Sequence, residues 1–189
     1  MSKAYFINKV LATTVVGSYP VVKAGGLKSL FDPLAGAVET AVTDQIGAGI
    51  DIISDGQVRG DMIGAFTSKL PGIREQEVIG KIQPAAAAIT AADTKYARSK
   101  FPKIKGIITG PTTLAHGLHI STPMYRNKEE VALDLAAALV TEARALEATG
   151  ITLLQIDEPI LSTGIADLGI AKQTVEQIAS SVRVPTCLH

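Results

Sequence analysis

Polar and ligand-type side chains follow short apolar segments at five points of the chain. The five tails read GSYP (17–20), SDGQVRGDM (54–62), GPTT (110–113), DEP (157–159) and CLH (187–189). Any one of them is explained most simply as an ordinary turn. Five in succession favour one shared site for a small polar molecule. Asp157 would bind an amine in it, and a carboxylate is a second expected group of the ligand.

Several tail residues also have structural roles open to them. Ser18 can cap the segment that follows it, or offer its hydroxyl and nearby amides to a carboxylate. Asp157 follows a buried strand, where an unpaired acid is costly, so a helix cap or a salt bridge is the alternative to a binding role. We expect Glu158, which precedes Pro159, to be solvated.

The remaining residues capable of chemistry carry less weight. Arg59 and Asp61 are expected to form a local ion pair, and Cys187 to be a small core residue rather than a nucleophile. His116 and His119 are expected in the loop after the third strand, too few for a metal site without carboxylates. Neither a Ser-His-Asp order nor a His-Glu-x-x-His pattern is visible.

The elements that must position these tails alternate along the chain. Runs of β-branched and aliphatic residues predict buried strands at 13–16, 50–53, 104–109, 151–156 and 182–186. Helices are predicted over 34–47, 128–149 and 168–181, and the segment 84–100 is expected to be partly helical. This alternation predicts a parallel α/β fold, either a doubly wound sheet or a (β/α)8 barrel, with functional residues at the carboxyl ends of the strands. No glycine fingerprint for a dinucleotide or a P-loop is present.

The clearest helix is the one predicted over 128–149. Asn127 is its expected N-cap, and Gly150 its expected end. Apolar residues recur on one face at helical spacing, namely Val131, Leu135, Leu139 and Leu146. The acidic residues are expected mostly on the other face, namely Glu130, Asp134 and Glu142.

Composition narrows the class of protein. The 189 residues include 18 Lys and Arg against 18 Asp and Glu, which argues against a nucleic-acid or anionic-membrane partner. A single cysteine excludes an intramolecular disulfide framework. No apolar run approaches the ~20 residues of a membrane span, and Met1 to Val10 lacks the pattern of a signal peptide. We therefore expect a cytoplasmic location.

Four motifs, read together, resemble the cobalamin-independent methionine synthase family. They are TTVVGSYP (13–20), DGQVRGDM (55–62), GPTTL (110–114) and QIDEP (155–159). They stand in the family's order, each at a strand end, and match its catalytic C-terminal barrel in the short form seen in archaea. The resemblance covers all 189 residues but only five of eight barrel strands. It implies one incomplete TIM-barrel domain, 1–189, truncated at the end of strand 5.

The resemblance implies a zinc-dependent methyltransferase that moves a methyl group to the thiol of homocysteine and forms methionine. In the family, zinc is held by His, two Cys and Glu, and it lowers the pKa of the substrate thiol. His189 matches the histidine ligand, whereas Cys187 matches no ligand position. Because the cysteine ligands are absent from this chain, we expect the full-length protein to be the enzyme and the 189-residue chain to be inactive.

The resemblance also assigns the substrate contacts. Gly17 and Ser18 match the site for the homocysteine carboxylate, and Asp157 matches the residue that receives the ammonium group. Gln57 stands where the family has a glutamate. A neutral amide can accept a hydrogen bond from an ammonium group but supplies no charge, so affinity should fall.

The methyl donor is the second departure from the family pattern. Folate-using members carry an aromatic residue after the Gly-Pro motif, whereas this chain reads LAHG at 114–117 and contains no Trp. This favours a methylated corrinoid such as methylcobalamin over methyltetrahydrofolate, with a corrinoid protein as a candidate partner.

Two other functions compete with this one. A uroporphyrinogen-decarboxylase-like barrel would need a deep basic pocket, for which Arg59 and Arg74 alone are poor support. An incomplete barrel could instead bind a small amino acid, or self-associate through exposed sheet edges, without catalysis.

Overall fold

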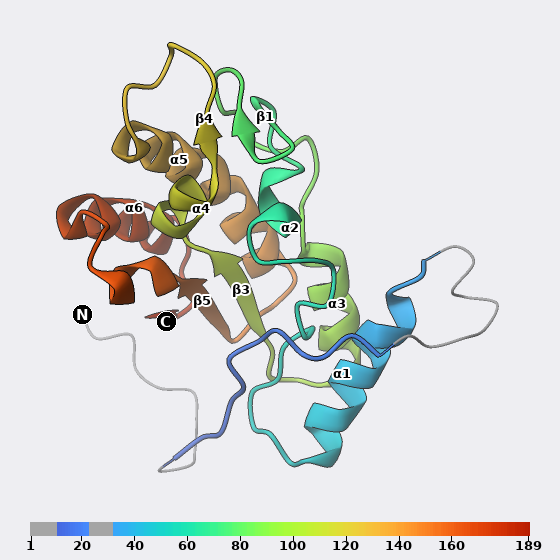
Figure 1. Ribbon diagram of the computed structural model, residues 1–189. Coiled ribbons are helices and arrows are strands. Elements are labelled where there is room, and N and C mark those ends of the chain that lie inside the picture. The colour runs from blue at the N-terminus through green and yellow to red at the C-terminus, as the bar shows by residue number, and fades with distance from the viewer. Residues whose placement is uncertain (1–10, 23–31) are drawn as a thin grey trace.

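A computed structural model shows an α/β fold and describes residues 11–22 and 32–189 (Figure 1). The N-terminal segment 1–10, for which the sequence predicts no signal peptide, lies outside the described residues, as does 23–31. The main sheet is parallel and has the order β3 (Lys105–Thr109), β5 (Leu153–Asp157) and β6 (Thr186–Leu188). Its register aligns Thr109 with Asp157, so the two strands end side by side.

Two earlier segments extend this parallel arrangement through single bridges. Ile53 pairs with Ile104 beside β3, and Ile52 pairs with Thr14 on its other side. The segments at 14, 52–53, β3, β5 and β6 therefore lie next to one another in chain order. The sequence predicts all five, but the first two are bridges rather than strands, and β6 begins later than predicted.

Helices connect and cover the strands. The long ones are α1 (Ala35–Gly47), α3 (Ala91–Lys100), α5 (Lys128–Ala148) and α6 (Leu168–Ser180), close to the predicted ranges. Two short ones, α4 (Pro111–Gly117) and the 3-10 helix η2 (Pro159–Thr163), begin directly after β3 and β5. Figure 1 shows α4, α5 and α6 packed together on one side of the sheet, with α3 beside β3 and α1 against α3. No helix in the described ranges is both long and apolar enough to cross a bilayer.

A second, smaller sheet lies apart from the first, at the top of Figure 1. It has the order β1 (Ile73–Arg74), β2 (Glu77–Val78) and β4 (His119–Ile120), and α2 (Gly64–Thr67) precedes it. Two-residue strands leave almost no periodic signal, and the sequence does not predict them.

The core packs α5 against the sheet and extends to α1, α3, α4 and α6. Asn127 accepts a hydrogen bond from the Glu130 N–H at 3.0 Å, which confirms the predicted N-cap of α5. All four apolar residues of the predicted face are buried, namely Val131, Leu135, Leu139 and Leu146. Since side chains alternate along a strand, the helix-facing positions are apolar, whereas Lys105, Gln155 and Asp157 share the opposite face.

Candidate functional site

The Gly17–Ser18 turn meets the Gln57 side chain. The Ser18 N–H donates to Gln57 Oε1 at 3.3 Å, and the next N–H, of Tyr19, donates to the Gly56 carbonyl at 2.7 Å. These bonds join two predicted tails that lie 39 residues apart. The first is long for a hydrogen bond, so a ligand carboxylate can replace Gln57 Oε1 as its acceptor.

Unusual backbone conformations shape this turn. Ser18 and Gln57 both have positive φ, at 52° and 49°, which is uncommon for residues with a side chain. Gly17 has φ 140°, and a Cβ there would lie 2.2 Å from Gln57 Oε1. Glycine suits position 17 because this φ is strained for any other residue, and a side chain there would also have to displace Gln57 Oε1.

Asp157 lies at the end of β5, where it is 5% exposed. Burial raises the pKa of this carboxyl, and the hydrogen bond from Gln155 opposes the shift. The His189 ring nitrogen Nδ1 lies 3.1 Å from Asp157 Oδ1. The structure thus brings together two predicted site residues, the proposed ammonium receptor and the proposed metal ligand.

Gln155 links Asp157 to the first tail. Its Nε2 donates to Asp157 Oδ1 at 2.7 Å and to the Val16 carbonyl at 2.8 Å, directly before Gly17. Its Oε1 accepts from Lys105 Nζ at 2.5 Å. Sequence reasoning missed Lys105 and Gln155. The sequence signal that could have found them is a polar residue inside a strand whose other residues are mostly apolar.

Glu158 is buried rather than solvated, contrary to the prediction. It is 2% exposed, and its carboxylate accepts from the backbone N–H groups of Thr112 and Thr113 at 2.8 and 2.6 Å. These N–H groups belong to the first turn of α4 and have no partner within the helix, so a carboxylate satisfies them well. Glu158 therefore ties the ends of β3 and β5 together.

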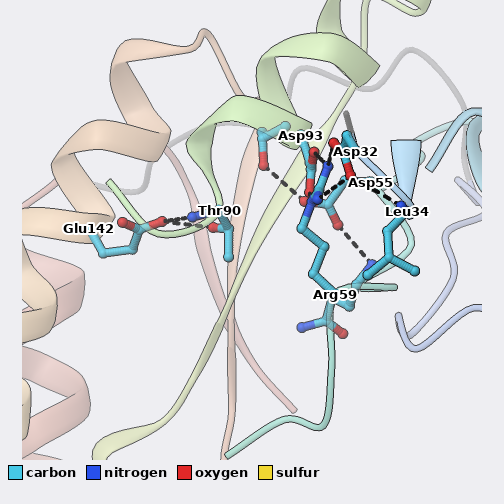
Figure 2. A network of polar contacts seen from close by, with 9 residues as sticks. Asp32, Leu34, Asp55, Arg59, Thr90, Asp93 and Glu142 are labelled. Carbon is cyan, nitrogen blue, oxygen red and sulfur yellow. Dashed lines mark hydrogen bonds and ion pairs between the residues drawn. The ribbon is translucent and has the colours of Figure 1, made fainter. Parts of the chain in front are cut away.

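A cavity of about 360 Å³ opens beside Ser18 and Gln57. Arg59 lines it, and Figure 2 shows its guanidinium held by two carboxylates. It donates to Asp32 at 2.9 and 2.6 Å, and to both oxygens of Asp93. The predicted Arg59–Asp61 pair is wrong, because Asp61 instead accepts from the N–H groups at the start of α2.

Two buried carboxylates support the wall of this cavity (Figure 2). Asp55 accepts from the Gln57 N–H at 2.9 Å and from Thr94 Oγ1 at 3.1 Å, and burial raises its pKa to about 6. Glu142 of α5 is 3% exposed and accepts from Ile89 and Thr90. Its predicted place on the polar face of the helix is therefore wrong.

The histidines and the cysteine fit a metal site poorly. His116 lies within α4 and His119 in β4, rather than in a loop as predicted. Cys187 is partly buried, and burial raises the pKa of its thiol. In the part of the chain that the structure describes, no group of three or more His, Cys, Asp or Glu residues could hold a metal ion. The described residues therefore do not by themselves make up a zinc site.

Comparison with known protein sequences finds a family model and several relatives that match the chain. A sequence model described as "Cobalamin-independent synthase, Catalytic domain" matches residues 11–187. The chain is 40% identical over 201 residues to a protein named methionine synthase from Methanothermobacter marburgensis, covering 95% of this chain and 65% of that protein. It is also 40% identical over 194 residues to one from Methanocaldococcus jannaschii, covering 95% and 62%. The chain thus spans less than two thirds of the length of these relatives.

Solved structures agree on the fold. A B12-independent methionine synthase from Shewanella sp. W3-18-1, in complex with selenomethionine, superposes with a TM-score of 0.78 at 24% identity. The match covers 95% of this chain and 61% of that one. A putative vitamin-B12-independent methionine synthase from Listeria monocytogenes gives a TM-score of 0.72 at 19% identity, covering 96% and 65%. At these identities the two matches show the fold alone.

Proposed function

Because the chain belongs to the family of cobalamin-independent synthase catalytic domains, we propose that it is part of a methyltransferase that forms methionine from homocysteine. The single observation that carries this is the convergence of two amino-acid-binding groups. The Gly17–Ser18 turn offers N–H donors for a carboxylate, and Asp157 offers a buried carboxylate for an ammonium group. Gln155 bonds to both segments.

We place the domain as the first five strands of a (β/α)8 barrel. The parallel segments follow one another in chain order, and polar residues gather at their carboxyl ends, as such barrels require. The match to 61% of the Shewanella chain supports this reading. The cytoplasmic location, the corrinoid-protein partner and self-association stay predictions.

In the reaction, the homocysteine thiol gives its proton to water, and the resulting thiolate attacks the methyl carbon of the donor. The new S–C bond forms as the bond between that carbon and the donor breaks, and the donor keeps the bonding electrons. A free thiol has a pKa of about 8.5, so the sulfur needs activation near neutral pH. Zinc would supply this activation when bound, and His189 would be one of its ligands. The other donors are not among the described residues of this chain.

A methylated corrinoid and methyltetrahydrofolate are the two candidate methyl donors. The family description, cobalamin-independent, weighs against our preference for a corrinoid. The lack of an aromatic residue at 114–117 is now weaker support for a corrinoid donor. Leu114 and Ala115 of α4 are both buried. These two positions therefore offer no surface on which a donor could stack.

The competing functions differ in their support. A uroporphyrinogen-decarboxylase-like pocket is not favoured, because Arg59 is already paired with Asp32 and Asp93. One observation favours a 189-residue chain that binds an amino acid without turnover. The described residues lack a donor set for a metal.

Calorimetric titration of the 189-residue chain with methionine tests the proposal. Asp157→Asn should weaken binding about 10- to 100-fold, since it removes a charged partner of the ammonium group. Asp167→Asn is the matched control, because Asp167 caps α6 and should not affect binding. Methyl transfer to homocysteine is then assayed with each donor. Equal affinities for the wild-type chain and both variants would contradict the site.

A further inference from the structure

We propose that Gln155 is a positioning residue that fixes the Gly17–Ser18 turn and Asp157 relative to one another, and that Lys105 sets the direction of its side-chain amide. The assignment rests on the proposed function, in which the turn and Asp157 receive the two charged ends of one amino acid. Neither Gln155 nor Lys105 needs to touch the ligand for this role.

The amide of Gln155 uses its donors on both halves of the site. Its Nε2 donates to the Val16 carbonyl at 2.8 Å and to Asp157 Oδ1 at 2.7 Å. A side-chain amide nitrogen carries two hydrogens, so both are engaged. The Val16 carbonyl carbon is bonded directly to the Gly17 nitrogen. Gln155 therefore holds the start of the carboxylate-binding turn and the ammonium receptor from one rigid group.

Lys105 determines which way this amide points. Its side chain is almost fully buried, and its Nζ donates to the carbonyl of Val15 and, at 2.5 Å, to Gln155 Oε1. An ammonium group donates and cannot accept. The amide oxygen must therefore face Lys105, and the NH2 group must face Val16 and Asp157. A flipped amide would turn its oxygen toward the Asp157 carboxylate and repel it.

Burial makes these contacts costly to lose. Gln155 is 4% exposed and Lys105 is 1% exposed, so water cannot readily replace a missing partner. Without the amide of Gln155, Asp157 would lose a hydrogen bond that holds its carboxylate in place. Recognition of the ammonium group should then weaken more than recognition of the rest of the ligand.

The test compares methionine with 4-methylthiobutanoate, which is methionine without its amine, by calorimetric titration of the 189-residue chain. Gln155→Met keeps the length of the side chain and removes the amide. We expect the ratio of the two affinities to fall about tenfold, the value of one lost hydrogen bond to a charged group. Lys105→Met should lower the ratio in the same direction, because the amide is no longer held.

Gln45→Met is the matched control. Gln45 is also buried and bonds to Ser54 through both its amide groups, but it lies on α1 and contacts neither half of the site. It should lower thermal stability and leave the affinity ratio unchanged. Should Gln155→Met fail to fold, Gln155→Asn takes its place, since the shorter amide cannot span from Lys105 to Asp157.

The outcomes separate the two proposals. A wild-type chain that prefers methionine, with a ratio that neither Gln155 variant lowers, overturns the positioning role alone. An equal loss of both ligands also overturns it, because that is the result of general destabilisation. A wild-type chain that binds neither ligand overturns the proposed function and the positioning role with it.

Discussion

A side chain at Gly110 would collide with Glu158. A Cβ added there would lie 2.2 Å from Glu158 Cδ and 2.4 Å from Glu158 Oε1. The carboxylate passes this close to the backbone in order to reach the N–H groups of Thr112 and Thr113. The absence of a side chain at the end of β3 thus admits the acid from the end of β5.

Gly110→Ala should therefore lower the free energy of unfolding by about 2–4 kcal/mol, measured by urea denaturation, through overpacking of a buried contact. The cost should shrink in a Glu158→Ala background, since the colliding carboxylate is then absent. Gly47→Ala is the control, because nothing lies within 4 Å of a Cβ added there. A Gly110→Ala chain as stable as the wild type would show that the acid lies elsewhere.

Asp55 should make stability fall as the pH rises. Its folded-state pKa of about 6 lies above the value of about 3.9 in an unfolded chain, so the folded state binds the extra proton between these values. The resulting stabilisation amounts to at most about 3 kcal/mol. It is complete below about pH 4 and lost by about pH 6. Asp55→Asn carries no such proton, so its stability relative to the wild type should rise across this window.

The matched comparison for Asp55 is Asp61→Asn, followed by urea denaturation over the same pH range. The backbone N–H groups of Gly64 and Ile63 lower the pKa of Asp61, so its contribution is lost as the pH falls rather than as it rises. The two variants should therefore show opposite slopes against the wild type. A pH-independent difference for Asp55→Asn would argue that its carboxyl titrates normally.

Arg59→Lys should cost about 1 kcal/mol of stability, since an ammonium group cannot pair side-on with both Asp32 and Asp93. The loss should shrink in about 0.5 M salt, because these side chains are partly exposed. Arg126→Lys is the control, as Arg126 is 86% exposed in its pair with Glu130 and should show no measurable change. Equal losses for both variants would refute the bridging role of Arg59.

Glu142→Gln should destabilise the chain by about 2–3 kcal/mol in chemical denaturation. The amide has one oxygen where the carboxylate has two, so its NH2 group would face the N–H of Ile89 or Thr90 and leave a buried donor unpaired. Glu176→Gln changes an acid that is 68% exposed and should have no comparable effect. The prediction fails if the two variants unfold together.

Local patterns predict the helices well. The extent of α5 follows from the spacing of Val131, Leu135 and Leu139 and from the cap at Asn127, all of which act within a few residues of one another. The same spacing misplaces Glu142, because its partners at 89–90 come from a loop more than fifty residues earlier. A pattern of period 3.6 reports which face is apolar, and it carries no information on a distant loop that buries an acid.

The candidate site is predicted in outline for a similar reason. The strand-end tails suggest Ser18 and Asp157, the family resemblance adds Gln57, and the structure joins Ser18 to Gln57 directly. The interior partners Lys105 and Gln155 are missed because their role depends on the register of β3 against β5, which no single segment encodes. Arg59 is assigned the wrong partner because a nearby acid in sequence is not the nearest acid in space.

Residues 13–16 are held to the rest of the molecule mainly by hydrogen bonds, so this segment should detach before the core unfolds. Hydrogen bonds from the Ile52 N–H, Lys105 and Gln155 hold this segment, while Val16 remains 56% exposed and contributes little apolar burial. A segment held in this way detaches at a lower free energy than the core beneath α5. Amide hydrogen exchange should therefore be faster at Ser18 and Tyr19 than in β3 and β5. An amino acid bound across the Gly17–Ser18 turn and Asp157 should slow that exchange, because it can bind only while the segment is attached.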